Sequence, residues 1–537
     1  MFRVPTPQNE PVLSYVPGSP ERTALEAEVA RQAKSPVDAP LFIGGDAVMT
    51  SETQAVISPH ARSLSLGRHA VATEADVARA IEAARQARGA WSTMPFADRA
   101  AIFLRAAELL AGPWRQRINA ATVLGQSKTP HQAEIDAACE LIDFFRFNVH
   151  FAEKMASEQP RSERGVWNRS ELRPLDGFVY AVTPFNFTSI AGNLPTAPAL
   201  MGNTVIWKPS SLSVISNHFV MELLREAGLP AGVVNLVRGD PASITRQVLA
   251  APDFAGLHFT GSTAVLKQLF AGVAHNLDHY RTYPRIVGES GGKDFLIAHP
   301  SADLQALAVA LLRGAFEYQG QKCSAASRAY IPRSLAPKLE ALLGGMMDEL
   351  RMGNPMDKGV FLGAVIGSNA FAKITGYQKL AKESGNATVL RGGGADDREG
   401  FFVEPTLVRV DDPKHRLMEE EIFGPILAMY VYDDAHFEDT LALCDATSPY
   451  ALTGAIFARD RGAIALATER LRHAAGNFYI NDKPTGAVVG QQPFGGGRMS
   501  GTNDKAGAAW NLMRWASPRS LKENLSPPHD WRYPFLG

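Results

Sequence analysis

One cysteine of this chain stands where a thiol is free to react. Cys323 lies in the stretch QGQKCSAASR, between the flexible Gly320, the cationic Lys322 and a run of small residues. A buried structural cysteine usually has apolar neighbours, because a thiol packs as a small hydrophobe. The neighbours of Cys323 are of a different kind, and we interpret this residue as a candidate nucleophile.

Three polar side chains beside glycine or proline could complete a thiol site. Asn186 lies in TPFNFTS, Glu289 in GESGGKDF and Glu421 in EEEIFGP. Acyl chemistry on a thiol needs a nucleophile, a base and an oxyanion donor, which cysteine, carboxylate and amide can supply. The ordinary alternatives are surface carboxylates for the two glutamates and an Asx turn for the asparagine.

A predicted strand-to-helix junction could bind a phosphate group. The run GLHF ends in Thr260-Gly261-Ser262 and leads into a helical stretch, which would direct free backbone N–H groups at an anion. An ordinary serine N-cap would have the same sequence. Lys208, in WKPSS after another predicted strand, could reach ribose or phosphate oxygens, although single lysines after strands are common.

The composition favours small-molecule chemistry. The 537 residues are 45% hydrophobic, enough for a sizeable core, and the net charge of −1 gives no field for nucleic acid or an anionic membrane. Cys139, Cys323 and Cys444 are too few and too scattered for a disulfide framework, and none has metal-ligand spacing. We therefore predict no metal site and a reducing compartment.

The chain shows no recognisable targeting or membrane segment. Residues 1–22 have no apolar core, and their prolines and acidic residues argue against an amphipathic transit peptide. No apolar run approaches the roughly 20 residues of a membrane span. We expect a cytoplasmic protein with no nucleic-acid or membrane partner.

The rhythm of the sequence changes at Gly177. The first ~50 residues are rich in proline and turn formers and are expected to wrap the surface. A helix is predicted from Thr73, with Asp76 three residues on in a capping-box pattern. After Gly177, short β-rich runs alternate with helical stretches, which is typical of a parallel sheet covered on both faces.

These patterns predict an α/β fold with two units. We assign residues 1–162 and 177–287 to a Rossmann-type, doubly wound domain with additional N-terminal helices. Residues 288–500 form a second α/β domain, and the boundary falls near GESGGK.

Seven short motifs resemble one enzyme family. They are TPFNF, WKPS, FTGS, GESGGK, GQKCSA, EEIFGP and PFGGGRMSG, in the order and at about the spacing found in the aldehyde dehydrogenase superfamily. The resemblance covers nearly the whole chain. Longer stretches such as FFRFN and NDKPTGAVVGQQPFGGGR are similar to the pyrroline-5-carboxylate dehydrogenase branch, which oxidises L-glutamate γ-semialdehyde to L-glutamate in proline degradation.

The resemblance implies roles for three catalytic residues. The thiolate of Cys323 attacks the aldehyde, and the Asn186 amide and the Cys323 backbone N–H hold the resulting oxyanion. Hydride leaves for a nicotinamide cofactor, and Glu289 activates the water that hydrolyses the thioester. A free thiol has a pKa near 8.5, so the site should lower that pKa or use a base.

The resemblance also implies a cofactor groove. Lys208 would meet the adenosine ribose, and Gly261 and Ser262 would meet the pyrophosphate. Glu421 would meet the nicotinamide ribose, and Phe423 would border the ring.

Three further residues bear on the choice of cofactor. Thr183 and Phe185 are implied to lie along the groove. Ser211 stands where many NAD-preferring relatives have an acidic residue, and serine does not repel a 2′-phosphate. We expect NAD to be preferred and NADP to be used less well.

The implied substrate carries a carboxylate at the end remote from the aldehyde. By resemblance, Ser324 and the loop Thr485-Gly486-Ala487 bind this group. Some relatives have serine at the position of Ala487, so here the Gly486 and Ala487 backbone N–H groups would be the main donors.

The ammonium and aliphatic parts of that substrate need other partners. Glu140, one helical turn from Phe144, would meet the ammonium, while Phe187 and Phe494 would flank the aliphatic chain. The alternative is that these aromatic rings belong to the ordinary core and that Glu140 is solvated.

The family implies an oligomerisation arm. A β-hairpin over residues 163–176 would pair between subunits, with residues 515–537 alongside, in a homodimer or a larger dimer-based assembly. Other readings remain open: a dehydrogenase for a different semialdehyde or aliphatic aldehyde, an acyl-CoA-forming relative, or an inactive binding or structural homologue. Cys323, Asn186 and Glu289 together argue against the last two.

Overall fold

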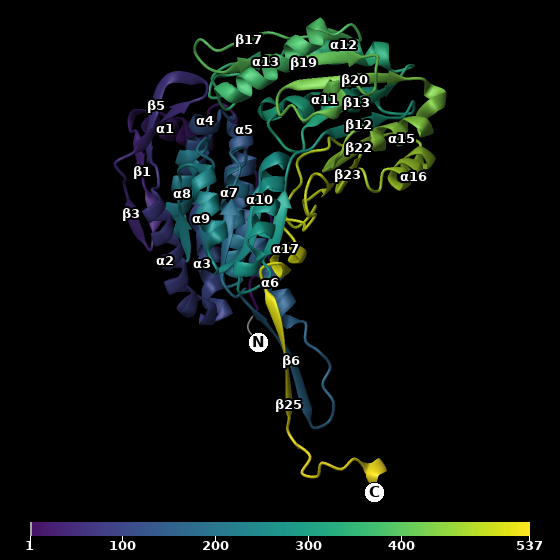
Figure 1. Cartoon of the computed structure of the whole chain (residues 1–537). Coiled ribbons are helices and arrows are strands. Elements are labelled where there is room, and N and C mark those ends of the chain that lie inside the picture. Colours follow the sequence, from purple (N-terminus) through teal and green to yellow (C-terminus); the bar gives the residue numbers. More distant parts are fainter. Residues whose placement is uncertain (1–2) are drawn as a thin grey trace.

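Two seven-stranded sheets with helices packed around them form the body of the chain (Figure 1). The computed structural model describes residues 3–537, so residues 1 and 2 of the predicted first segment lie outside the described residues. Within residues 3–537, no helix is both long and apolar enough to cross a membrane. The predicted α/β class is confirmed.

The first sheet carries the segment predicted to be Rossmann-like. In sheet order its strands are β11 (Arg285–Glu289), β10 (Phe254–Thr260), β7 (Phe178–Val182), β8 (Thr204–Lys208), β9 (Val234–Leu236), β2 (Leu41–Ile43) and β3 (Asp46–Val48). The five strands from β11 to β9 are mutually parallel, and β2 and β3 extend the sheet beyond β9 through antiparallel pairings. Parallel strands present their carboxyl ends at one edge, so β7, β8, β10 and β11 all end on the same side.

Helices cover the first sheet and build the N-terminal region. They are α1 (Pro20–Lys34), α2 (Glu74–Thr93), α3 (Phe96–Ala111), α4 (Arg115–Gln126), α5 (Pro130–Ala133), the π-helix η1 (Glu134–Glu140), α6 (Leu141–Ser157), α7 (Thr188–Leu200), α8 (Val214–Glu226), α9 (Pro241–Ala250) and α10 (Thr263–His275). The capping box predicted at Thr73 is present, with reciprocal hydrogen bonds between Thr73 and Asp76. Helix α1 was not predicted, although Ser19 caps it and Pro20 begins it, because proline at a helix start resembles a turn former.

The second sheet follows directly in the chain. Its strands, in sheet order, are β16 (Ala387–Arg391), β19 (Thr406–Val410), β20 (Ile426–Tyr432), β13 (Ala326–Pro332), β12 (Asp294–Ala298), β22 (Thr453–Phe457) and β23 (Asn477–Ile480). Its helices are α11 (Leu304–Phe316), α12 (Ala336–Asp348), α13 (Ser368–Glu383), α14 (Arg416–Glu419), α15 (Phe437–Ala446) and α16 (Arg461–Arg470), whereas the later helix α17 (Ala509–Met513) returns to the first unit and packs against α6. The chain crosses between the sheets over residues 290–293, near the predicted boundary at 288, while the domain assignment itself stays a prediction.

Short strands complete the structure. A three-stranded sheet contains β1 (Val37–Ala39), β5 (Ala61–Ala70) and β4 (Thr53–Ser58). Two-stranded pairs are β14 (Arg351–Met352) with β15 (Val360–Leu362), β17 (Ala395–Asp396) with β18 (Phe402–Val403), and β21 (Tyr450–Ala451) with β24 (Gly497–Arg498).

A two-stranded ribbon projects from the body (Figure 1). It pairs β6 (Val166–Arg173) antiparallel with β25 (Ser517–Asn524), in register from Ser517 opposite Arg173 to Asn524 opposite Val166. The predicted hairpin over residues 163–176 is therefore wrong in detail. That segment contains one eight-residue strand and too few further residues for a second, so its partner comes from the C-terminal region.

Candidate active site

One groove, of about 590 Å³, brings the predicted cofactor positions together. Its lining includes all eight of them, namely Thr183, Phe185, Lys208, Ser211, Gly261, Ser262, Glu421 and Phe423. Asn186 and Cys323 line the same groove. Residues from both sheets therefore meet at the carboxyl edge of the first sheet, which is where ligands bind in open α/β sheets.

The helix that follows β10 points its N-terminus at the groove. Ser262 is the N-cap of the 13-residue helix α10, and its hydroxyl accepts a hydrogen bond of 3.3 Å from the Val265 backbone N–H. Gly261 lies against Phe259, whose ring would be 2.7 Å from a Cβ atom placed at that position. The serine is thus a true N-cap and also a groove residue, and the first turn of α10 can attract an anion.

Lys208 and Ser211 line the same groove as this helix terminus. Lys208 is the last residue of β8, and burial lowers the pKa of its side chain. Ser211 is exposed at the groove margin. A cationic and a hydroxyl side chain close to a helix N-terminus suit the phosphates and sugar hydroxyls of a dinucleotide.

The opposite wall is formed by residues around Glu421. Its carboxylate accepts a 3.1 Å hydrogen bond from the Gly292 backbone N–H, and burial raises its pKa. Phe423 has a left-handed backbone, with φ of +61°, and its ring meets that of Phe185 edge-on at 5.9 Å. This wall presents an acceptor and two aromatic rings to the groove.

Cys323 lies in a turn between the 3₁₀ helix η3 (Glu317–Gly320) and β13. The three residues from Tyr318 to Gly320 all have positive φ, at +50°, +54° and +65°. Left-handed backbone costs a non-glycine residue roughly 1–2 kcal/mol. The path that leads to the nucleophile is therefore strained and needs support from its surroundings.

Hydrogen bonds from distant segments supply that support. The Gln319 side chain donates to the Ser127 carbonyl at 3.0 Å and to the Ala364 carbonyl at 2.6 Å. The Gln321 side chain accepts from the Ile366 backbone N–H at 2.9 Å. The turn is consequently held in one conformation before any substrate binds.

The surroundings of Cys323 favour the neutral thiol over the thiolate. Burial raises its pKa, and the nearby carboxylates of Asp294, Glu421 and Glu289 raise it further. We expect the thiol to be activated either by a lowered pKa or by a base. Because its pKa is raised, activation by a base is the option that fits this geometry.

Asn186 follows β7 and is positioned by the nucleophile turn itself. Its side-chain amide donates a 3.1 Å hydrogen bond to the Gln321 carbonyl. An amide nitrogen carries two N–H groups, so one remains for another acceptor. The buried side chain lines the groove together with Cys323 and could donate to an oxyanion formed there.

Glu289, the last residue of β11, is held from the other side. One carboxylate oxygen accepts from the Gly496 backbone N–H at 3.1 Å, and the other is buried without a hydrogen-bond partner in the described part of the chain. Burial raises the pKa of Glu289 to about 8. Its side chain does not line the cofactor groove but points toward residues 495–501, while Ser290 and Gly291 beside it do line the groove.

The predicted carboxylate-binding residues lie beyond the nucleophile. The Ser324 hydroxyl is 2.8 Å from the Thr485 hydroxyl, which joins the nucleophile turn to the loop that contains Gly486 and Ala487. Gly486 has a φ of +96°, a conformation that favours glycine. Phe494 pairs through its backbone with Ala506, in hydrogen bonds of 3.0 and 2.8 Å.

Glu140 and Phe187 lie on neighbouring elements. Glu140 ends the π-helix η1 and accepts a 2.9 Å hydrogen bond from the Ser189 hydroxyl, and burial raises its pKa to about 8. Phe144 is buried in α6. Phe187 is half-buried and immediately precedes α7, and its ring centroid lies 4.3 Å from the Lys128 ammonium.

Sequence reasoning missed a buried ion pair beneath Phe187. Lys128 and Asp136 are 2.7 Å apart, and the ammonium lies 4.3 Å from the ring centroids of Phe187 and Tyr318. Asp136 also accepts from the Ser189 backbone N–H and hydroxyl. In the sequence, a lysine and an aspartate eight residues apart resemble ordinary surface charges, and no local signal marks them as buried.

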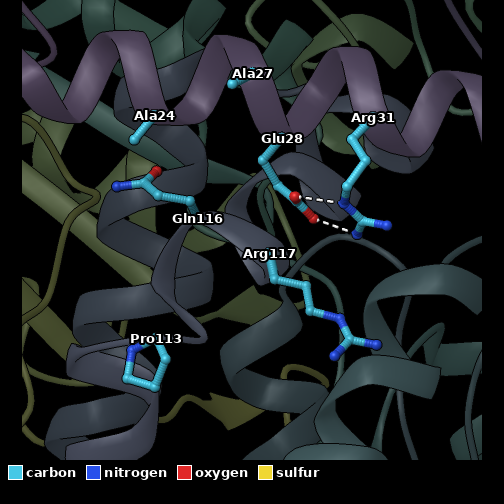
Figure 2. Close-up of a pocket in the computed structure, with 7 residues that line it drawn as sticks. All are labelled: Ala24, Ala27, Glu28, Arg31, Pro113, Gln116 and Arg117. Atoms are coloured by element: carbon cyan, nitrogen blue, oxygen red, sulfur yellow. Dashed lines mark hydrogen bonds and ion pairs between the residues drawn. The ribbon is translucent and has the colours of Figure 1, made fainter.

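A second cavity, of about 530 Å³, lies between α1 and α4 (Figure 2). Its lining residues are Ala24, Ala27, Glu28, Arg31, Pro113, Gln116 and Arg117. The Glu28 and Arg31 side chains pair with each other through hydrogen bonds of 2.6 and 2.7 Å. None of the predicted site residues lines this cavity.

Known proteins resemble this chain over nearly its full length. A model of the aldehyde dehydrogenase family matches residues 48–521. A bovine protein named delta-1-pyrroline-5-carboxylate dehydrogenase, mitochondrial, is 49% identical over 98% of this chain and 94% of its own. An Agaricus bisporus protein named delta-1-pyrroline-5-carboxylate dehydrogenase is also 49% identical, over 99% of this chain and 98% of its own.

Solved structures agree with these relatives. The crystal structure of the Mycobacterium tuberculosis delta-pyrroline-5-carboxylate dehydrogenase bound with NAD has a TM-score of 0.97 and 54% sequence identity to this chain. The match covers 100% of this chain and 99% of that one.

The comparisons contradict the expected cytoplasmic location, because the bovine, human and Dictyostelium discoideum relatives are all named as mitochondrial. The few scattered cysteines behind that expectation fit any reducing compartment and cannot separate the cytoplasm from another one. The fold, the groove and the extent of the family match lead to one conclusion: this chain belongs to the aldehyde dehydrogenase family.

Proposed function

We propose that this enzyme oxidises L-glutamate γ-semialdehyde to L-glutamate with NAD. The observation that carries the proposal is the single groove that joins Cys323 and Asn186 to all eight cofactor positions. Relatives at 49% identity are named delta-1-pyrroline-5-carboxylate dehydrogenase, and the Mycobacterium tuberculosis enzyme at 54% identity was crystallised with NAD.

The residues of the groove fit NAD. The N-terminus of α10 and Lys208 would hold the phosphates and the adenosine ribose, and the Glu421 carboxylate would accept from the nicotinamide ribose. Bound there, the nicotinamide ring supplies the hydride acceptor. The exposed Ser211 neither repels nor pairs with a 2′-phosphate, so we propose that NADP is accepted less well than NAD.

In the proposed acylation step, Cys323 loses its proton to a base and its sulfur attacks the aldehyde carbon, and the resulting thiohemiacetal would become a thioester once its hydride has left for the bound nicotinamide. The free N–H of the Asn186 amide and the Cys323 backbone N–H then hold the oxyanion. The strained turn before Cys323 is held in place without substrate, and it therefore positions the thiol for attack in advance.

Glu289 is proposed to act as the base that activates water for thioester hydrolysis. A pKa of about 8 suits a general base near neutral pH. The Gly496 N–H donates to one carboxylate oxygen at 3.1 Å, and the second oxygen has no hydrogen-bond partner among residues 3–537. The side chain can therefore leave residues 495–501 and turn toward the thioester by breaking one hydrogen bond.

Cys323→Ser should lose dehydrogenase activity by several orders of magnitude while folding normally, because a neutral hydroxyl is a poor nucleophile. NADH absorbance at saturating aldehyde measures the loss. Cys139→Ser and Cys444→Ser are matched controls that should retain activity, since both thiols are buried in helices away from the groove. Activity of Cys323→Ser within tenfold of wild type would remove this thiol from the mechanism.

Glu289→Gln should release about one NADH per site in a burst and then stall with a thioester on Cys323. Mass spectrometry of the quenched variant would show the acyl group on the peptide that contains Cys323. In wild type the hydrolysis rate should rise between about pH 7 and 9, because the carboxylate form becomes dominant above the pKa of about 8. Equal loss of acylation and hydrolysis in Glu289→Gln would contradict this division of roles.

The substrate assignment is tested by kcat/KM across glutamate semialdehyde, succinate semialdehyde and unsubstituted aliphatic aldehydes of matching length. Sites that pair buried polar groups reject analogues lacking them by up to about 10⁴–10⁵, whereas apolar tunnels discriminate by only about 10–200-fold. For aliphatic aldehydes, which lack both the ammonium and the carboxylate, we expect kcat/KM to fall by about 10⁴–10⁵. An aliphatic aldehyde used as efficiently as the amino-acid semialdehyde would refute the assignment, and strict dependence on CoA would indicate an acyl-CoA-forming enzyme.

We further propose that the ribbon of β6 and β25 assembles this protein into a homodimer or a larger assembly of dimers. A two-stranded ribbon is marginally stable in water by itself, and it exposes Trp167. Light scattering should give at least a dimer mass for the full chain and a lower mass after deletion of Ser517–Gly537. A stable monomer of the full chain at working concentration would contradict the proposal.

A further inference from the structure

The N-terminal strap, residues 4–13, is held to the helical region by carboxylates. Backbone N–H groups at Val4, Glu10 and Leu13 donate to Glu153 at 3.0 Å, Asp143 at 2.7 Å and Glu134 at 2.9 Å. These acceptors lie on η1 and α6, so the strap runs along these helices in a fixed register. Charge-assisted hydrogen bonds of this kind are stronger than neutral ones.

One side chain of the strap reaches a different part of the molecule. The Asn9 amide nitrogen donates to Asp143 and to the Val489 carbonyl, both at 2.8 Å, and the Asn9 carbonyl oxygen accepts from Gln491 at 2.9 Å. Two donors and an acceptor are what an asparagine side chain offers, and here all three are used. Asn9 therefore joins α6 to the loop of residues 485–492.

That loop is joined to other segments at both of its ends, and inside it the Gln491 and Gln492 backbone N–H groups donate to the Val488 carbonyl at 3.0 and 2.9 Å. It lies between β23 and β24 and contains no helix or strand. At its start, Thr485 contacts Ser324 through their hydroxyls at 2.8 Å. At its end, Asn9 holds Val489 and Gln491. Gly486 and Ala487, whose N–H groups are the proposed donors for the substrate carboxylate, lie between these two anchors.

The strap has a separate set of contacts that do not involve the loop. Glu10 pairs with Arg115 at 2.6 Å and with Arg146 at 2.7 Å, both from the helical region. Loss of these pairs would loosen the strap but would leave the Asn9 side chain with its three partners. The chain thus offers a matched variant that separates the stability of the strap from the position of the loop.

We propose that Asn9 is a positioning residue for substrate recognition, which fixes the loop of residues 485–492 so that its backbone N–H groups can bind the substrate carboxylate. This inference rests on the proposed function. Asn9 does not touch the substrate itself, and its effect should appear only with aldehydes that carry the remote carboxylate. Loss of its hydrogen bonds would let the loop move, and a shift of about 1 Å in a binding group is enough to weaken recognition markedly.

The test compares Asn9→Ala with wild type on glutarate semialdehyde and on pentanal, which have the same chain length and differ in the carboxylate. We expect the KM for glutarate semialdehyde to rise roughly tenfold, because Asn9→Ala removes three hydrogen bonds, one of them to a carboxylate, and part of their free energy holds the loop. The KM for pentanal should change by less than about twofold. Glu10→Gln should lower the melting temperature but keep the wild-type ratio of the two KM values.

Each other outcome is distinct. Wild type that does not prefer glutarate semialdehyde to pentanal would overturn the proposed function and this inference together. A wild-type preference that Asn9→Ala retains, or an equal loss on both aldehydes, would overturn the inference alone. Should Asn9→Ala fail to fold, Gln491→Ala removes an exposed partner instead, and an unchanged KM for glutarate semialdehyde then overturns the proposal.

Discussion

Two glycines at the crossing between the sheets allow the groove and the nucleophile to meet. A Cβ atom at Gly292 would lie 2.5 Å from the Cys323 carbonyl oxygen, and one at Gly291 would overlap the Glu421 carboxylate. The Gly292 N–H also donates to Glu421. Because no side chain fits here, the nucleophile turn, the cofactor wall and the end of β11 pack against one short piece of backbone. A larger residue at either glycine would move these parts away from one another.

The same close packing makes the site electrostatically costly. Burial raises the pKa values of Glu289, Asp294 and Glu140 to about 8, and it also raises that of the Cys323 thiol. Of these carboxyl groups, Glu289 and Asp294 act directly on the thiol, and shifted pKa values that gather around one nucleophile are common at functional sites. The left-handed backbone at Tyr318 and Gln319 adds strain next to Cys323, and the hydrogen bonds that the Gln319 side chain donates to the Ser127 and Ala364 carbonyls offset it.

A loop without helix or strand is held in a defined position for substrate recognition. The loop of residues 485–492 is held at one end by the nucleophile turn and at the other by the N-terminal strap. The strap is itself fixed by buried carboxylates on η1 and α6. Recognition of the remote end of a substrate would therefore depend on residues at both ends of the chain, which come together only in the folded state.

Local patterns in the sequence determined the α/β class and the helix from Thr73, and the resemblance of short motifs to a known family indicated the residues that line the cofactor groove. These features leave a signal because strand and helix periods, caps and glycine-rich turns involve residues close together in the chain. The tertiary structure alone decided the pairing of β6 with β25, the burial of Lys128 against Asp136 and the bridge from Asn9 to Val489. Each of these three contacts joins polar groups from elements that are far apart in the chain. Such contacts produce no periodic pattern in the sequence, so only the packing of whole elements shows them.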